Sequence, residues 1–145
     1  MAVKYAHFVL NSANVLTIAS QKSETPDGTL IVFGFSICNT KEDRYYRKVG
    51  NQIAYQRMVD DSYGFYIEER FVKITHHLIS LRLIQVIRSI IETHLCFKKM
   101  DSYKNFNSKT LINDMHLLEY DVLEILEQNI SKTLKQNVYR MVEDE

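Results

Sequence analysis

Residues 31–57 read IVFGFSICNTKEDRYYRKVGNQIAYQR, an apolar run followed by a basic, tyrosine-rich run, and this segment decides the fold. The continuous apolar part predicts a strand that is buried on both faces. The polar part predicts a helix over residues 42–60, with Asn39 or Thr40 as its N-cap. The segment therefore predicts a buried strand that leads directly into a helix.

Two more strands are predicted before this segment. Val3–Leu10 and Val15–Ser20 are rich in β-branched and aromatic residues, and the NSAN between them contains asparagines that suit a turn. Pro26, Asp27 and Gly28 supply turn chemistry before the buried strand. Three antiparallel strands are therefore expected before the first helix.

A long central helix is predicted over Glu69–Lys99, where apolar residues recur every three or four positions. At 1.5 Å per residue this helix would be about 45 Å long, which exceeds the width of most small domains. We therefore expect it to pair with a second copy of the chain. A further amphipathic helix is predicted to begin near Ser108, with the tail at 130–141 as its extension.

The length and composition are those of one globular domain. A chain of 145 residues, of which 46% are hydrophobic and 25% charged, can bury a single core. We expect an α+β fold in one domain, residues 1–145. Its β-rich part, 1–38, forms a three-stranded antiparallel sheet, and its mainly helical part, 39–145, forms three helices.

The charge and the cysteines exclude several classes of function. Lys plus Arg equals Asp plus Glu at 18 each, so no global positive field attracts nucleic acid or a membrane, and anion binding must be local. Cys38 and Cys96 form neither a disulfide framework nor a zinc knuckle. The amino terminus lacks a secretion signal, and the most apolar segment is too polar to span a membrane. A cytoplasmic protein is expected.

The best candidate site is a basic and aromatic cluster on the first predicted helix. Guanidinium groups bind phosphate or carboxylate, and tyrosine rings can stack on a base. In the structural alternative, Arg44 and Lys48 are solvated while Tyr46 and Arg57 pack and pair internally. The cluster consists of Arg44, Tyr45, Tyr46, Arg47, Lys48, Tyr55 and Arg57.

No metal or catalytic site is indicated by residue spacing. His76 and His77 are adjacent on a predicted helix and point about 100° apart, and His94 lies about five turns further on, so they cannot converge alone. Ser36 and Cys38 have no acid or base partner marked by spacing and no nucleophile-elbow glycines. We expect no metal, no cofactor and no enzymatic activity.

Within the opening segment, FGFSICNTKEDRYYRKVGNQIAYQR resembles part of small phage-encoded proteins: an apolar strand, a Cys-Asn turn, an acidic residue, Arg-Lys, Gly, Ile-Ala and a closing Arg. It is similar to the Thoeris anti-defence proteins, which sequester cyclic ADP-ribose-type signals without cleaving them. The resemblance covers residues 31–57 only. It implies ligand contacts at Asn39, Arg47 and Arg57, and an oligomer that acts as a nucleotide-signal sponge in the cytoplasm of the host cell.

Three functions remain as alternatives. The first is a non-enzymatic counter-defence protein, a homodimer or higher homo-oligomer, that binds an anionic partner: a nucleotide-type immune signal or a host defence protein. The second is a small DNA- or RNA-binding regulator whose basic track is extended by Lys98, Lys99, Lys104 and Lys109. The third is a protein–protein inhibitor whose acidic helix face docks on a basic host surface. This face carries Asp114, Glu119, Asp121, Glu124 and Glu127.

Overall fold

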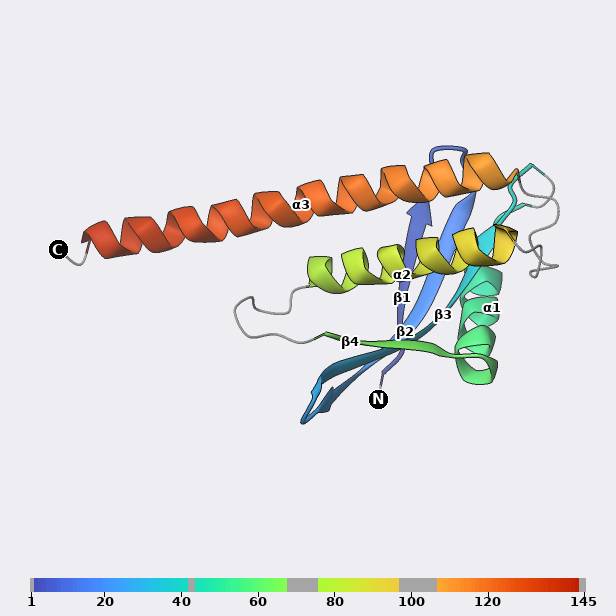
Figure 1. Ribbon diagram of the computed structural model, residues 1–145, viewed down its shortest axis with the longest axis horizontal. Helices are drawn as coiled ribbons and strands as arrows, with labels where there is room; N and C mark the ends of the chain where they lie inside the picture. Colours follow the sequence, from blue (N-terminus) through green and yellow to red (C-terminus); the bar gives the residue numbers. More distant parts are fainter. Residues whose placement is uncertain (1, 42–43, 68–75, 97–106, 144–145) are drawn as a thin grey trace. The chain divides into compact units, whose positions relative to one another are not determined.

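The computed structural model describes residues 2–41, 44–67, 76–96 and 107–143. Within these ranges an α+β fold with an antiparallel sheet and three helices is confirmed (Figure 1). In chain order, the elements are β1 (Lys4–Val9), β2 (Val15–Thr25), β3 (Gly28–Cys38), α1 (Arg47–Asp60), β4 (Tyr63–Ile67), α2 (His76–Cys96) and α3 (Ser108–Glu143).

The chain divides into two compact units, residues 1–73 and residues 74–145. The first unit contains the strands and α1, and the second contains α2 and α3. The basic and aromatic cluster of the sequence therefore lies within the first unit. The expectation of one domain over residues 1–145 stays a prediction.

The first unit is built on a four-stranded sheet in the order β1-β2-β3-β4, in which all neighbours are antiparallel. The three predicted strands are present, and β4 is an addition that corrects the expected count. β4 has only five residues, one of them Gly64, although its other four residues are of strand-forming types. It is held by pairing with β3 and by ring contacts of Phe33 with Tyr63 and Phe65, at 5.7 and 5.9 Å between centroids.

The β2–β3 hairpin is the longest pairing in this sheet. Its register runs from Val15 opposite Cys38 to Thr25 opposite Gly28. Pro26 occupies the turn, and Gly28 has a φ of 129°, a value that side chains disfavour. β2 continues beyond its predicted end because its polar residues pair with the apolar start of β3.

β3 is buried on both faces over Phe33–Ile37, as its continuous apolar pattern predicts, and β2 is buried on both faces over Val15–Ala19. Because side chains alternate along a strand, the register assigns each residue to one of two faces. α1 covers the face that carries Thr17, Ala19, Gly34 and Ser36. The other face carries large apolar side chains that are at most 8% exposed: Leu16, Ile18, Ile31, Phe33, Phe35 and Ile37.

α1 begins at Arg47, later than predicted, and neither proposed N-cap caps it. Its N-cap position is Tyr46, which is extended (φ −122°, ψ 120°) and makes no capping hydrogen bond with its side chain. The backbone N–H of Thr40 donates instead to Asn14 Oδ1 at 3.2 Å. Asn39 accepts the N–H of the second residue after it. Both residues therefore serve the loop before α1; residues 42–43 lie outside the described ranges.

The contact of α1 with the sheet is made backbone against backbone. Gly50, Ala54 and Met58, at successive intervals of four, are the buried residues of the helix. A Cβ on Gly34 of β3 would lie 2.5 Å from Ala54 O and 2.7 Å from Met58 Cα, and closer still to Met58 N. The absence of a side chain at Gly34 therefore allows α1 to lie directly on β3.

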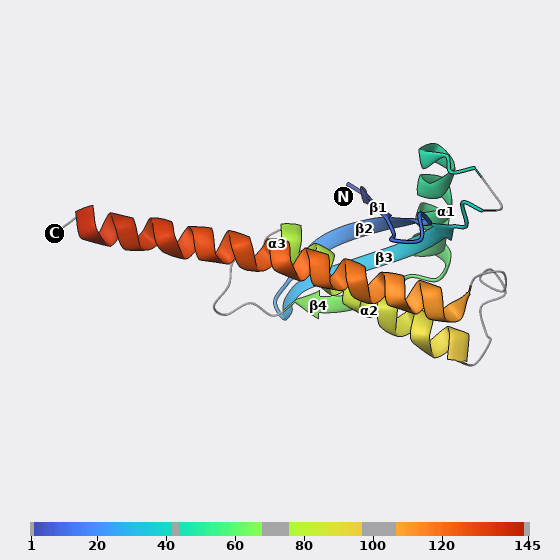
Figure 2. The ribbon, with the colours of Figure 1, turned by 90° about the horizontal axis from the view of Figure 1, so that it is seen from above.

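The second unit is an antiparallel pair of helices, α2 and α3 (Figure 2). α2 has 21 residues, and the parts of the predicted helix at 69–75 and 97–99 lie outside the described residues. α3 has 36 residues, or about 54 Å at 1.5 Å per residue. The tail at 130–141 continues α3, as predicted. The longest described helix is therefore α3, and not the central helix α2.

Apolar burial and one ion-pair cluster hold α2 against α3. Glu119 accepts from Arg88 Nε at 2.6 Å and from Gln85 Nε2 at 3.2 Å, while Glu92 lies 3.1 Å from His116. Burial lowers the pKa of Arg88, but its hydrogen bond with Glu119 and the charges of both carboxylates raise the pKa to a net value above the ordinary one. The apolar side chains buried in this unit are Leu81, Leu83, Ile84, Ile87, Ile91, Leu111, Met115, Val122 and Leu126.

The described helices include none with the length and hydropathy of a membrane span.

Replacing Gly34 by alanine should destabilise the protein by about 2 to 3 kcal/mol, because the new methyl group meets backbone atoms that cannot move aside cheaply. Gly64→Ala is the matched control, since its Cβ would meet nothing closer than 3.4 Å. Urea denaturation of both variants measures the difference. Equal stability of the two variants would contradict the close seating of α1 on Gly34.

Replacing Glu119 by glutamine should cost about 1 kcal/mol in free energy of unfolding, because a partly buried, charge-assisted hydrogen bond to Arg88 is weakened. The loss should shrink in 1 M NaCl, which screens the pair. Glu124→Gln, at an exposed position of the same helix, serves as the control and should change little. Equal losses for both variants would show that the Arg88 pair contributes nothing specific.

Candidate ligand-binding site

An open hollow of about 530 Å³ lies beside α1 in the first unit. Tyr5 of the edge strand β1 forms one side. The other side is one flank of α1, because positions i, i+1, i+4, i+5 and i+8 lie together on a helix. These helical residues are Arg47, Lys48, Asn51, Gln52 and Tyr55.

A chain of hydrogen bonds joins the two elements that border this hollow, β1 and α1. Arg47 Nη2 lies 3.1 Å from His7 Nδ1, and His7 Nε2 lies 2.6 Å from Asn51 Oδ1. A guanidinium group can only donate, so Nδ1 accepts the hydrogen bond and the proton of neutral His7 is on Nε2. His7 is half-buried on β1 and thereby connects two residues of α1.

The lining of the hollow is positive and aromatic. Of the six described residues that line it, Arg47 and Lys48 are cationic and none is a carboxylate. Tyr5 and Tyr55 are 40% and 42% exposed, so they offer aromatic surface to a ligand. In a chain with no net charge, this is a local site suited to an anion that carries an apolar or ring-shaped part.

Of the predicted ligand-binding residues, Arg47, Lys48 and Tyr55 come together at the hollow. Arg44 and Tyr46 lie elsewhere: the guanidinium carbon of Arg44 is 5.5 Å from the ring centroid of Tyr46, a cation–π contact before the helix. Their part in binding stays a prediction.

The other three predicted residues make contacts within the protein. Arg57 Nη1 donates to Phe35 O at 3.0 Å, across the α1–β3 contact. The hydroxyl of Tyr45 lies 3.3 Å from Thr17 Oγ1, and its ring lies under Gly50. Asn39 belongs to the loop before α1. These contacts agree with the structural alternative for Arg57 and leave ligand binding by the three residues untested.

Sequence reasoning missed part of the site. Asn51 and Gln52 lie on the predicted helix and could have been found by continuing its basic flank by one turn. Tyr5 and His7 come from a strand 40 or more residues earlier in the chain. No local signal connects them to α1, because their position depends on the register of the whole sheet.

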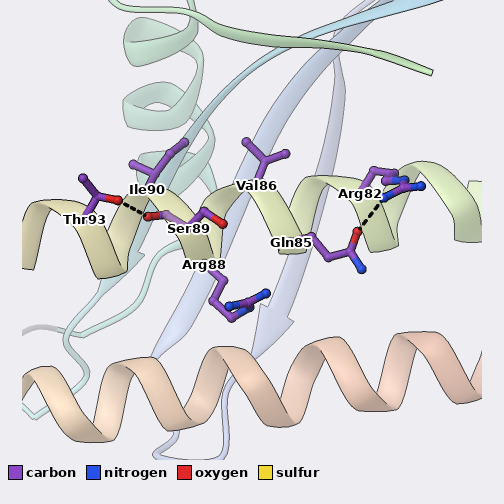
Figure 3. A pocket seen from close by; sticks show the side chains of 7 residues that line it. All are labelled: Arg82, Gln85, Val86, Arg88, Ser89, Ile90 and Thr93. Atoms are coloured by element: carbon purple, nitrogen blue, oxygen red, sulfur yellow. Dashed lines mark hydrogen bonds between the residues drawn. The ribbon is translucent and has the colours of Figure 1, made fainter. Parts of the chain in front are cut away.

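A second open hollow, of about 540 Å³, lies along α2 (Figure 3). Its two arginines are engaged: Arg82 donates to Gln85, and Arg88 is paired with Glu119 and Glu92. Carboxylates therefore neutralise part of its positive charge, which makes it a weaker candidate for an anion. It is lined by Arg82, Gln85, Val86, Arg88, Ser89, Ile90 and Thr93.

The acidic face predicted for the last helix is smaller than expected. Asp114 is only 2% exposed, and Glu119 is bound to α2, so neither is available on a solvent-facing acidic surface. The hydrogen bonds of Glu119 with Gln85 and Arg88 of α2 explain the loss of Glu119 from this face. Asp121, Glu124 and Glu127 are exposed, as predicted.

Most of the basic track of the nucleic-acid alternative lies outside the described residues. Lys98, Lys99 and Lys104 lie outside the described residues. Lys109 is exposed near the start of α3.

The described residues contain no group of three metal-ligating side chains. His76 and His77 meet edge to face, with ring centroids 5.7 Å apart. Ser36 Oγ donates to the carbonyl of Gly50 at 3.3 Å beneath α1, so this hydroxyl serves helix packing. Cys38 is half-buried at the end of β3.

Comparison of the chain with models of protein families, with curated proteins and with solved structures found no match.

Proposed function

We propose that the protein is a non-enzymatic binding protein that captures a small, nucleotide-type anion in the hollow between β1 and α1. The observation that carries this proposal is the shared lining of Arg47, Lys48, Tyr5 and Tyr55, without a carboxylate among the described lining residues. Cations supply attraction to phosphate, and exposed tyrosine rings supply stacking surface for a base.

The size and openness of the hollow support a small ligand. A volume of about 530 Å³ is within the range of small-molecule sites, about 300 to 1,000 Å³. Two adjacent cations line the hollow in a protein with no net charge, and such a small local positive site favours a compact anion over a long polyanion. The proposal therefore favours a free nucleotide over DNA or RNA.

Sequestration of such a ligand is the role we propose, in a phage-type counter-defence protein that acts in the host cytoplasm. Support comes from the resemblance of residues 31–57 and from the hollow, where Arg47 of that segment lies. A homo-oligomer is part of this proposal, as is the absence of a chemical step. A host defence protein is the alternative partner.

Binding of AMP should be measured by isothermal titration calorimetry, with adenosine and ribose 5-phosphate as partial ligands. Lys48→Gln should weaken AMP binding about tenfold, because a charge-assisted hydrogen bond is worth about 1.5 kcal/mol or more. Tyr55→Leu should weaken AMP binding by a similar factor and leave ribose 5-phosphate unchanged, because only the base can stack.

Arg44→Gln is the control, since it removes an arginine of the same basic run that does not line the hollow. It should change AMP affinity less than twofold. Equal binding of adenosine and AMP would refute an anion site. Equal losses in Lys48→Gln and Arg44→Gln, with a steep salt dependence, would instead favour the nucleic-acid alternative.

A further inference from the structure

The hydrogen bonds between His7 and two lining residues, Arg47 and Asn51, determine which groups remain for a ligand. Arg47 Nη2 donates to His7 Nδ1, and His7 Nε2 donates to Asn51 Oδ1. The direction of the first hydrogen bond determines that of the second, because guanidinium has no acceptor and a neutral imidazole has one donor and one acceptor. The amide oxygen of Asn51 is thus engaged by His7.

What remains on Arg47 and Asn51 is a set of donors. Asn51 keeps the two N–H groups of its amide, and the other N–H groups of Arg47 are donors by nature. Lys48, beside them in the lining, can also only donate. These three side chains therefore present N–H groups to the hollow and can satisfy a ligand that is rich in acceptors.

We propose that His7 is a positioning residue that commits Arg47 and Asn51 to donation, so that the hollow selects a phosphoryl oxyanion. The inference rests on the proposed function and deepens it, because it names the group that the cationic end of the site recognises. A phosphate matches this set: its oxygens accept several hydrogen bonds, and its charge is complementary to Arg47 and Lys48.

His7 acts here through its neighbours and does not line the hollow. Without it, the Asn51 amide could rotate and present its oxygen, which would repel a phosphate oxygen. Arg47 would also lose the contact that holds it beside β1. The residue therefore affects both the orientation and the position of the donors.

The first test is the protonation of His7 in the ligand-free protein. A long-range ¹H–¹⁵N correlation spectrum at pH 8.5 distinguishes the two neutral tautomers. We expect the proton on Nε2. A proton on Nδ1 would overturn the proposal, because Arg47 could not then donate to that atom.

The second test is the binding of inorganic phosphate and AMP to variants of the full chain. Asn51→Asp keeps an acceptor for His7 but replaces the amide donors by a charged oxygen, so phosphate binding should fall at least tenfold while the His7 tautomer and the melting temperature change little. His7→Phe should weaken phosphate binding severalfold. His7→Gln, which has one acceptor and one donor group, should recover part of that loss.

The outcomes separate this inference from the proposed function. If wild-type protein binds AMP and Asn51→Asp binds phosphate and AMP equally well, the donor selection is wrong and the binding function stands. If wild-type protein binds neither probe, the proposed function fails, and the selection of phosphate fails with it. If His7→Gln binds phosphate as weakly as His7→Phe, hydrogen bonding by residue 7 does not position the donors, and the positioning role is wrong.

Discussion

The direct contact of α1 with the backbone of β3 is the constraint on which the first unit depends. Gly34 lies directly against backbone atoms of Ala54 and Met58, so the helix is closer to β3 than any residue with a side chain would allow. Close packing of this kind fixes the position of the helix on the sheet. It places the flank of α1 at a defined distance from β1, and that distance creates the hollow.

Polar contacts secure the same interface at both ends. Ser36 bonds to the carbonyl of Gly50 near the start of the helix, and Arg57 bonds to the carbonyl of Phe35 near its end. Each contact satisfies a group that would otherwise be costly to bury. The arginine that closes the basic run thus contributes to the architecture, while Arg47 and Lys48 remain for the site.

The local sequence pattern was sufficient to predict the elements with strong periodicity. It was insufficient for elements whose position or bounds depend on long-range contacts. The apolar run of β3 and the helical repeat of α3 are local signals, and both were predicted. β4 depends on pairing with β3, and the start of α1 depends on Tyr45 docking beneath Gly50, which no local propensity records. The site divides in the same way: its helical half lies on a predicted helix, whereas Tyr5 and His7 reach it only through sheet register.

The position of β1 at the sheet edge has a consequence for dynamics. An edge strand has a neighbour on one side only and can open locally at less cost than the centre of a sheet. Tyr5 and His7 are on that strand, so a transient departure of β1 would dismantle the hollow while β2, β3 and α1 stay folded. A bound ligand is then linked to the closed strand by mass action. Slower amide exchange in β1 would be a signature of an occupied site.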